Sequence, residues 1–284
     1  MRLCRFGDGR LGVVDGSLVR DVTKALDVLP SHRYPLPTHD VLIANLDEVK
    51  RRIADIQKEA PTLPLASVSL LSPVANPGKI VAAPLNYQAH VEEYKDDPQL
   101  NQQKFGQSIQ STALFLKATS SLVGPGQGVE ARHRDRRTDH EVELVVVIGR
   151  TASRVARDKA LQYVAGYAVG LDMTIRGTED RSFRKSLDTF SVVGPWLVTA
   201  DEIADPNALD LSVSINGEIR QQANTRQMIL DVPALIELAS AYYTLQPGDL
   251  LFTGTPEGVS PVQPGDRIVA TVESVGTMTV DVRG

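Results

Sequence analysis

The sequence predicts a mixed α/β fold that is rich in strands, a barrel or roll of mixed strands preceded by a small N-terminal α+β unit. Three observations predict it: short apolar runs recur at fairly regular spacing, turn signals such as Asn216-Gly217 separate them, and helical patterns are few. Long connections between some of these strands favour a barrel or roll over a doubly wound parallel sheet.

Residues 1–72 are expected to form the small N-terminal domain. Turns at Asp8-Gly9 and Asp15-Gly16 break its first apolar strands, and a helical pattern follows. The apolar residues on one face of that helix are Val41, Leu42, Leu46, Val49 and Ile53. A proline-punctuated passage from Pro61 to Pro77 joins this unit to residues 73–284, which we expect to form the catalytic domain.

The second domain is expected to be dominated by strands. The expected strands are 79–83, 113–118, 141–148, 167–172, 211–215, 249–253 and 267–272, and the expected helices are 88–94 and 232–243. The glycine-rich segment 124–128 is interpreted as turns, because proline follows its first glycine. The polar segment 95–112 is either a loop that orders over a site or a solvated excursion.

Composition excludes several classes of protein. The chain has 284 residues, 35 acidic and 30 basic side chains and one cysteine, so disorder, a disulfide framework and a multi-cysteine metal site are excluded. Apolar stretches reach about ten residues, against the roughly 20 that a membrane helix needs, and no signal peptide is recognised. We therefore expect a cytoplasmic protein with a small-molecule partner, bound to neither membrane nor nucleic acid.

Two carboxylates stand at the start of an apolar strand. Glu141 and Glu143 are two residues apart, so they project from one face, and Asp172 ends a second apolar strand. If the strands are neighbours, three carboxylates share one space and repel unless a cation lies between them. Oxygen donors without histidine or thiolate suit Mg²⁺ or Mn²⁺, with Ca²⁺ as a weaker fit. The alternative is an acidic strand end that faces solvent.

A second candidate site lies at the expected helix 88–94. His90 and Glu93 are neighbours on one helical face, where a carboxylate can orient an imidazole as a general base. The alternative is a surface ion pair. Downstream of Asp172, four cations are interleaved with acidic residues in a charged loop that is either solvated or holds an anionic substrate. These cations are Arg176, Arg181, Arg184 and Lys185.

Six ordered motifs resemble those of the fumarylacetoacetate hydrolase family. They occupy Asn86 to Glu93, Asp139 to Gly149, Gly166 to Asp172, Lys185 to Trp196, Asn216 to Ile229 and Pro247 to Val259. The resemblance covers residues 73–284, and it implies a β-roll of mixed strands, a homodimer and action on 2-oxo acids. The preceding seventy residues look like the small unit often found in these proteins.

The resemblance also implies roles for individual residues. Glu141, Glu143 and Asp172 would ligate Mg²⁺ or Mn²⁺. The residues implied in catalysis are His90 with Glu93, as the base that activates water, and Lys185. The residues implied in substrate binding are Asn86, Tyr87, Arg176, Glu179 and Thr255.

Three positions depart from the family pattern. Pro84 stands where glycine is frequent, Gly177 replaces a common acidic residue, and Glu179 replaces a common glutamine. A carboxylate at position 179 would disfavour a second anionic group of the substrate unless Arg181 or Arg184 pairs with it. A neutral or sugar-derived substrate tail therefore remains open.

The resulting hypothesis is metal-dependent hydrolysis of a carbon–carbon bond in a 2,4-dioxo acid, either an acylpyruvate or a fumarylacetoacetate-like compound. His90 would activate water, and cleavage of the carbon–carbon bond would release pyruvate as an enolate. Decarboxylation of oxaloacetate and isomerisation of a 2-hydroxydienedioate are alternatives on the same scaffold. A metal-dependent binding protein without turnover is a third interpretation.

Overall fold

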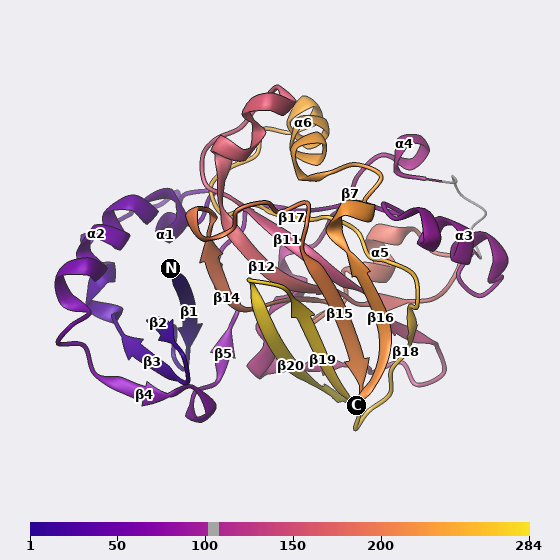
Figure 1. Cartoon of the computed structure of the whole chain (residues 1–284), viewed down its shortest axis with the longest axis horizontal. Coiled ribbons are helices and arrows are strands. Elements are labelled where there is room, and N and C mark those ends of the chain that lie inside the picture. The colour runs from indigo at the N-terminus through magenta and orange to yellow at the C-terminus, as the bar shows by residue number, and fades with distance from the viewer. Residues whose placement is uncertain (102–107) are drawn as a thin grey trace.

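The computed structural model describes residues 1–101 and 108–284 (Figure 1). Its helices are α1 (Val41–Ala44), α2 (Leu46–Ile56), α3 (Gln88–Asp96), α4 (Ile109–Thr112), α5 (Arg181–Lys185) and α6 (Val232–Tyr242). Its strands in the N-terminal unit are β1 (Arg2–Phe6), β2 (Arg10–Asp15), β3 (Leu18–Asp21), β4 (Thr62–Pro64) and β5 (Leu70–Leu71).

The remaining strands confirm the predicted strand-rich character of the second unit. They are β6 (Ile80–Ala82), β7 (Phe115–Lys117), β8 (Leu122–Val123), β9 (Val129–Glu130), β10 (Thr138–His140), β11 (Val142–Ile148), β12 (Val164–Asp172), β13 (Thr174–Ile175), β14 (Ser191–Thr199), β15 (Asp210–Ile215), β16 (Glu218–Asn224), β17 (Leu250–Phe252), β18 (Ser260–Pro261), β19 (Arg267–Val272) and β20 (Gly276–Arg283). All seven expected strands and both expected helices are present, with ends that differ by a few residues.

Most strands of the described chain belong to two sheets. The larger has the order β4-β3-β2-β1-β14-β12-β11-β17-β6-β7, and the smaller has the order β16-β15-β19-β20-β9. In the smaller sheet, β15 and β16 form the hairpin that Asn216-Gly217 predicts. Both turn residues have positive φ, 52° and 88°, which is the backbone of a tight hairpin turn.

The N-terminal unit continues the larger sheet instead of standing apart. Strand β1 pairs antiparallel with β14, with Leu3 opposite Leu197, as the indigo strands on the left of Figure 1 illustrate. One hydrophobic cluster contains Leu3 and Leu11 together with Val145 and Phe252 of the second unit. The two units therefore share a sheet and a core, and the boundary at residue 72 stays a prediction.

Helix α2 covers this shared core with part of the predicted face. The single helix expected there is divided at Asn45, and Val41 and Leu42 belong to α1. Leu46, Val49 and Ile53 are buried at the spacing of successive helical turns. The shorter helix α1 lies just before α2 in the chain. Asp40 caps its N-terminus, because one carboxylate oxygen of Asp40 accepts a hydrogen bond from the Ile43 N–H at 3.0 Å. Its second oxygen accepts from two backbone N–H groups at positions 75 and 76, so one buried carboxylate joins α1 to the interdomain passage.

Two sequence interpretations concern irregular segments. Segment 124–128 forms a short 3₁₀ turn between β8 and β9, which confirms the interpretation as turns. Of segment 95–112, residues 102–107 lie outside the described residues, so the choice between a loop over the site and a solvated excursion stays a prediction. Among the described helices, none combines the length and the apolar character needed to cross a membrane.

Candidate active site

The register of β11 and β12 brings the three predicted carboxylates together. The strands are antiparallel, with Val142 opposite Leu171 and Glu143 opposite Gly170, and the Asp172 N–H donates to the Glu141 carbonyl at 2.9 Å. Glu141, Glu143 and Asp172 thus lie at one end of one sheet face. Oxygens of all three come within 4.8 Å of one another, and all three residues are buried.

Lysines and an arginine surround two of these carboxylates. Lys185 Nζ donates to Glu141 at 2.6 Å, to Asp172 at 2.7 Å and to the Thr174 hydroxyl at 2.6 Å. Burial alone would raise the pKa of Glu141, but Lys185 and Arg176 outweigh burial and hold it well below its usual range. Glu141 is therefore ionised at neutral pH.

Glu143 is the member of the cluster that lacks a cation. Its Oε2 accepts from the Gly254 N–H at 2.6 Å, and within the described residues no cationic side chain lies within 4.0 Å of it. Burial first, and then the charges of Asp172 and Glu141, raise its pKa well above the usual value. Three buried hard oxygen donors with an unbalanced negative charge fit a divalent ion such as Mg²⁺ or Mn²⁺.

Gly254 can present its N–H to Glu143 only as glycine. Its φ is +97°, and a Cβ there would lie 2.7 Å from the Cβ of Asn86. Asn86 itself donates to the carbonyl oxygens of Leu230 and Thr253 at 2.9 and 2.8 Å, and its Oδ1 accepts from the Leu230 N–H. The Asn86 amide is thus used to position the Gly254 loop, and the expected substrate contact at Asn86 stays a prediction.

Lys117 is a site residue that the sequence reasoning missed. It ends β7, its side chain is fully buried, and its Nζ donates to Asp172 and to the Phe190 carbonyl. Burial lowers its pKa, and the neighbouring Asp172 partly opposes that shift. The sequence did contain a signal for it, a lysine inside the expected apolar strand 113–118. Lysine is rarely buried without a partner, so this position indicated a buried acidic partner.

Arg176 contacts the carboxylate cluster through Glu141 and also binds Asp139. Its Nε donates to Asp139 at 2.7 Å and its Nη2 donates to Glu141 at 3.1 Å. Although burial lowers the pKa of Arg176, the two carboxylates outweigh burial and raise it. This guanidinium therefore holds Glu141 in place as well as lining the cavity.

The predicted histidine dyad has the geometry of a general base. His90 Nδ1 lies 2.7 Å from Glu93 Oε2, and Glu93 Oε1 accepts from the Gly258 N–H at 2.9 Å. A carboxylate beside Nδ1 favours the tautomer with the proton there, which leaves Nε2 unprotonated as a base. His90 lines the same cavity as the three carboxylates.

Most of the predicted residues line one cavity. These are His90, Glu141, Glu143, Asp172, Arg176, Lys185 and Thr255, and Tyr94, Phe115, Arg181 and Arg184 join them. Thr255 accepts from Gln221 Nε2 at 2.9 Å. Tyr87 does not line the cavity: it is 1% exposed, its hydroxyl has no hydrogen-bond partner among the described residues, and burial raises its pKa.

Glu179 pairs with an arginine and is not among the residues that line the cavity, and the expected substrate contact there stays a prediction. Arg136 donates to both of its carboxylate oxygens at 2.8 and 2.9 Å, outside the cavity. A Cβ at Gly177 would lie 2.1 Å from Arg136 Nη2, so glycine at 177 leaves room for this ion pair. The charge at 179 is thus neutralised by an arginine that the sequence reasoning did not consider.

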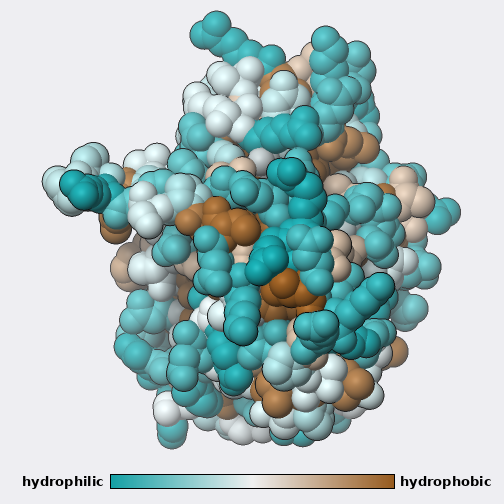
Figure 2. Space-filling model, turned by 90° about the vertical axis from the view of Figure 1, so that its left-hand side faces the viewer, coloured by the Kyte–Doolittle hydropathy of each residue, from teal (hydrophilic) through white to brown (hydrophobic). Residues whose placement is uncertain are grey.

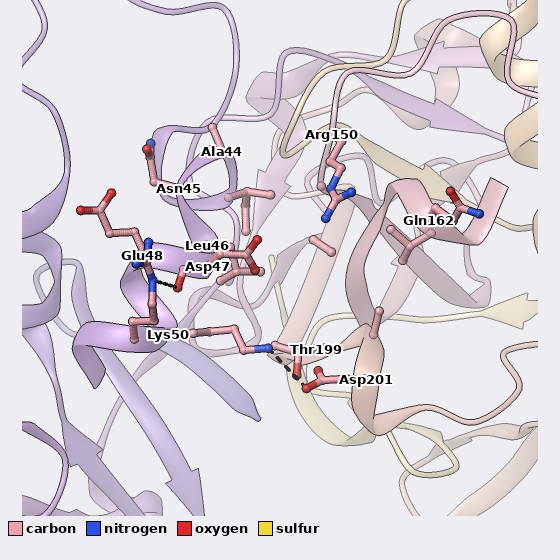
Figure 3. Close-up of a pocket in the computed structure, with 16 residues that line it drawn as sticks. Ala44, Asn45, Leu46, Asp47, Glu48, Lys50, Arg150, Gln162, Thr199 and Asp201 are labelled. Carbon is pink, nitrogen blue, oxygen red and sulfur yellow. Dashed lines mark hydrogen bonds and ion pairs between the residues drawn. The ribbon is translucent and has the colours of Figure 1, made fainter. Parts of the chain in front are cut away.

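A separate hollow lies between the N-terminal unit and the second unit. It has a volume of about 460 Å³, and Lys50 of α2 reaches across it to Asp201 at 3.3 Å, opposite Arg150 and Gln162 (Figure 3). The molecular face on the N-terminal side is mainly hydrophilic, with small separate hydrophobic areas (Figure 2). This hollow shares no lining residue with the carboxylate cavity.

Comparison with known proteins identifies the family. The C-terminal domain of fumarylacetoacetate (FAA) hydrolase matches residues 79–283. The chain belongs to this family. A maleylpyruvate hydrolase of Aquipseudomonas alcaligenes is 57% identical over 285 residues, which cover 100% of this chain and 99% of the relative.

Two further comparisons show which members of this family the chain resembles. A crystal structure of maleylpyruvate hydrolase from Sphingobium sp. SYK-6 in complex with manganese(II) and pyruvate is 44% identical, with a TM-score of 0.84 over 100% of this chain and 99% of that chain. A bifunctional isomerase/decarboxylase of 4-hydroxyphenylacetate degradation from Salmonella dublin is 38% identical over 72% of this chain and 47% of the relative. The predicted fold and the expected metal-dependent hydrolase of this family are therefore confirmed.

Proposed function

We propose that this enzyme hydrolyses an acylpyruvate of the maleylpyruvate type to pyruvate and a carboxylic acid. The observation that supports it is that the buried carboxylate triad and His90, which pairs with Glu93, line one cavity. The full-length similarity to proteins named maleylpyruvate hydrolase supports the choice of substrate. Glu141, Glu143 and Asp172 would hold the ion, for which we propose Mn²⁺ or Mg²⁺.

In the proposed mechanism, the His90 Nε2 takes a proton from water as the water oxygen forms a bond to C4 of the substrate. The C3–C4 bond then breaks, and its electron pair passes to the pyruvate fragment as an enolate. The protonated His90 returns the proton to C3, which completes pyruvate. Glu93 stabilises the imidazolium, and the Gly258 N–H holds Glu93 in position.

The bound ion supplies Lewis-acid stabilisation of negative charge on the oxygens of the 2-oxo acid end. The contacts of Lys185 support a role in positioning carboxylates beside the catalytic role that the family resemblance implies. All three of its N–H donors are used by Glu141, Asp172 and Thr174. We propose that Lys185 orients the two carboxylates and contributes positive charge, and that it donates to substrate only after it leaves one of these partners.

The test is a product assay with maleylpyruvate, oxaloacetate and a 2-hydroxydienedioate, each with Mn²⁺, with Mg²⁺ or with a chelator. Equal amounts of maleate and pyruvate, with one oxygen of isotopically labelled water in the maleate, support hydrolysis. Carbon dioxide from oxaloacetate, or an isomer formed without water uptake, would favour the alternatives. Metal-dependent binding without any product would identify a binding protein.

We also propose that the enzyme acts as a homodimer. The apolar side chains of Leu116, Phe183 and Tyr242 are 40%, 59% and 76% exposed, on β7, α5 and α6. Aromatic side chains such as Phe183 and Tyr242 are enriched at protein–protein interfaces. Light scattering of the wild type and of Phe183→Asp tests this, and a monomeric wild type contradicts it. Cytoplasmic location and the absence of membrane and nucleic-acid partners stay predictions.

A further inference from the structure

Arg181 of α5 lines the cavity without contacting the carboxylate triad. Its Cζ lies 5.7 Å from the centroid of the Phe115 ring, so the guanidinium is held against an aromatic side chain. The acidic residues next to it in sequence are used elsewhere: Glu179 pairs with Arg136, and Asp180 accepts from the Ser182 N–H as the cap of α5. Among the ion pairs of the described residues, none involves Arg181.

Arg181 also stands between the cavity and the surface. An outer hollow of about 530 Å³, lined by Ser111, Thr112 and Tyr243, shares Phe115 and Arg181 with the inner cavity. The inner cavity has a volume of about 40 Å³, which holds little more than a water molecule. A substrate whose 2-oxo acid end lies at the carboxylate triad is too large for the inner cavity alone, and the outer hollow beyond Arg181 has room for its other end.

We propose that Arg181 binds a carboxylate at the far end of the substrate, so that the enzyme selects acylpyruvates whose acyl group ends in an anion. This inference rests on the proposed function. A guanidinium offers two parallel N–H donors that match a carboxylate. An anionic tail is therefore the complement of this half-buried arginine, which forms no ion pair among the described residues.

Three observations support this assignment. Arg184 lies one helical turn away on α5 and lines the same cavity, and its Nε donates to the Glu179 carbonyl at 2.9 Å, so its positive charge is held beside the proposed subsite. Burial lowers the pKa of both arginines, which shows that each charge has lost hydration that an anionic ligand would replace. Glu179 does not oppose an anionic tail, because Arg136 neutralises it.

The decisive experiment compares two substrates in Arg181→Gln. Maleylpyruvate ends in a carboxylate, whereas acetylpyruvate ends in a methyl group. We expect kcat/KM for maleylpyruvate to fall about 10- to 100-fold, the value of a charged hydrogen bond, while kcat/KM for acetylpyruvate stays within about 3-fold. Arg267→Gln is the control, because it removes the same charge from an exposed pair with Asp281 on the second sheet. Equal losses for both substrates, or no loss, would overturn the inference.

A binding measurement separates this inference from the proposed function. Calorimetry on the manganese-loaded protein uses 2-oxoheptanedioate and 2-oxoheptanoate, which differ only in the terminal carboxylate. We expect the wild type to bind the dianion more tightly, and Arg181→Gln to remove that preference without weakening the monoanion. Equal affinity of the wild type for both probes would overturn the role of Arg181. A wild type that prefers the dianion but cleaves no acylpyruvate would overturn only the proposed function.

Discussion

Glu141 and Asp172 face each other across β11 and β12, and the Asp172 N–H donates to the Glu141 carbonyl at 2.9 Å. This backbone bond fixes the separation of two carboxylates, and the strand alternation adds Glu143 on the same face. The site is therefore a property of strand register, because a shift by one residue would turn all side chains of a strand to the opposite face.

The first prediction concerns the metal and Glu143. Because this buried carboxylate has no cationic partner among the described residues, a divalent ion should stabilise the wild type by about 2.7 kcal/mol when its free concentration is 100 times its Kd. Glu143→Gln should lose most of this stabilisation and bind Mn²⁺ more weakly. Calorimetry and denaturant unfolding with and without Mn²⁺ measure both. Exposed Glu59→Gln is the control, and normal manganese affinity in Glu143→Gln would refute the ligand assignment.

The second prediction concerns Lys117. Its removal in Lys117→Met leaves Asp172 buried with one cation fewer, so the free energy of unfolding should fall by about 3–5 kcal/mol in the presence of a chelator. Added Mn²⁺ should recover part of the loss, because the ion supplies positive charge to Asp172. Lys50→Met, which breaks an exposed pair with Asp201, should change stability by less than about 1 kcal/mol. A loss that metal leaves unchanged would contradict this role.

The third prediction concerns the base. His90→Gln should lower kcat about 10²- to 10⁴-fold, since the proton acceptor is lost, while the affinity for Mn²⁺ stays unchanged. Glu93→Gln should lower kcat less, because the histidine remains but its imidazolium is less stabilised. Glu92→Gln lies on the same helix with an exposed side chain and should behave as wild type. Steady-state kinetics and metal titration check this, and weakened metal binding in His90→Gln would argue against a separate base.

The fourth prediction concerns pH and Cys4. Burial raises the pKa of this thiol from 9.0 to about 12, so the native protein should resist alkylation by iodoacetamide at pH 8 and react only when unfolded. Because the folded-state pKa is the higher one, the neutral thiol contributes stability that is complete below about pH 9. That contribution is lost as pH rises from about 9 towards about 12. Rapid labelling of the folded protein at pH 8 would show that Cys4 is accessible.

Local sequence patterns predicted the elements well for a physical reason. The continuous apolar run of 144–148 and the helical spacing of Leu46, Val49 and Ile53 each depend on residues close in the chain. The boundary between the two units was less predictable. The pairing of β1 with β14 joins residues almost two hundred positions apart, and no local signal carries it.

The sequence by itself determined which residues form the strands and the helix that carry the carboxylates and the histidine, because these patterns are local. Only the tertiary structure decided which side chains meet. It pairs Lys117 with Asp172 and Arg136 with Glu179, and it places Arg181 between the cavity and the surface. Each of these relationships joins side chains from different elements. Burial and charge compensation become defined only when those elements pack together.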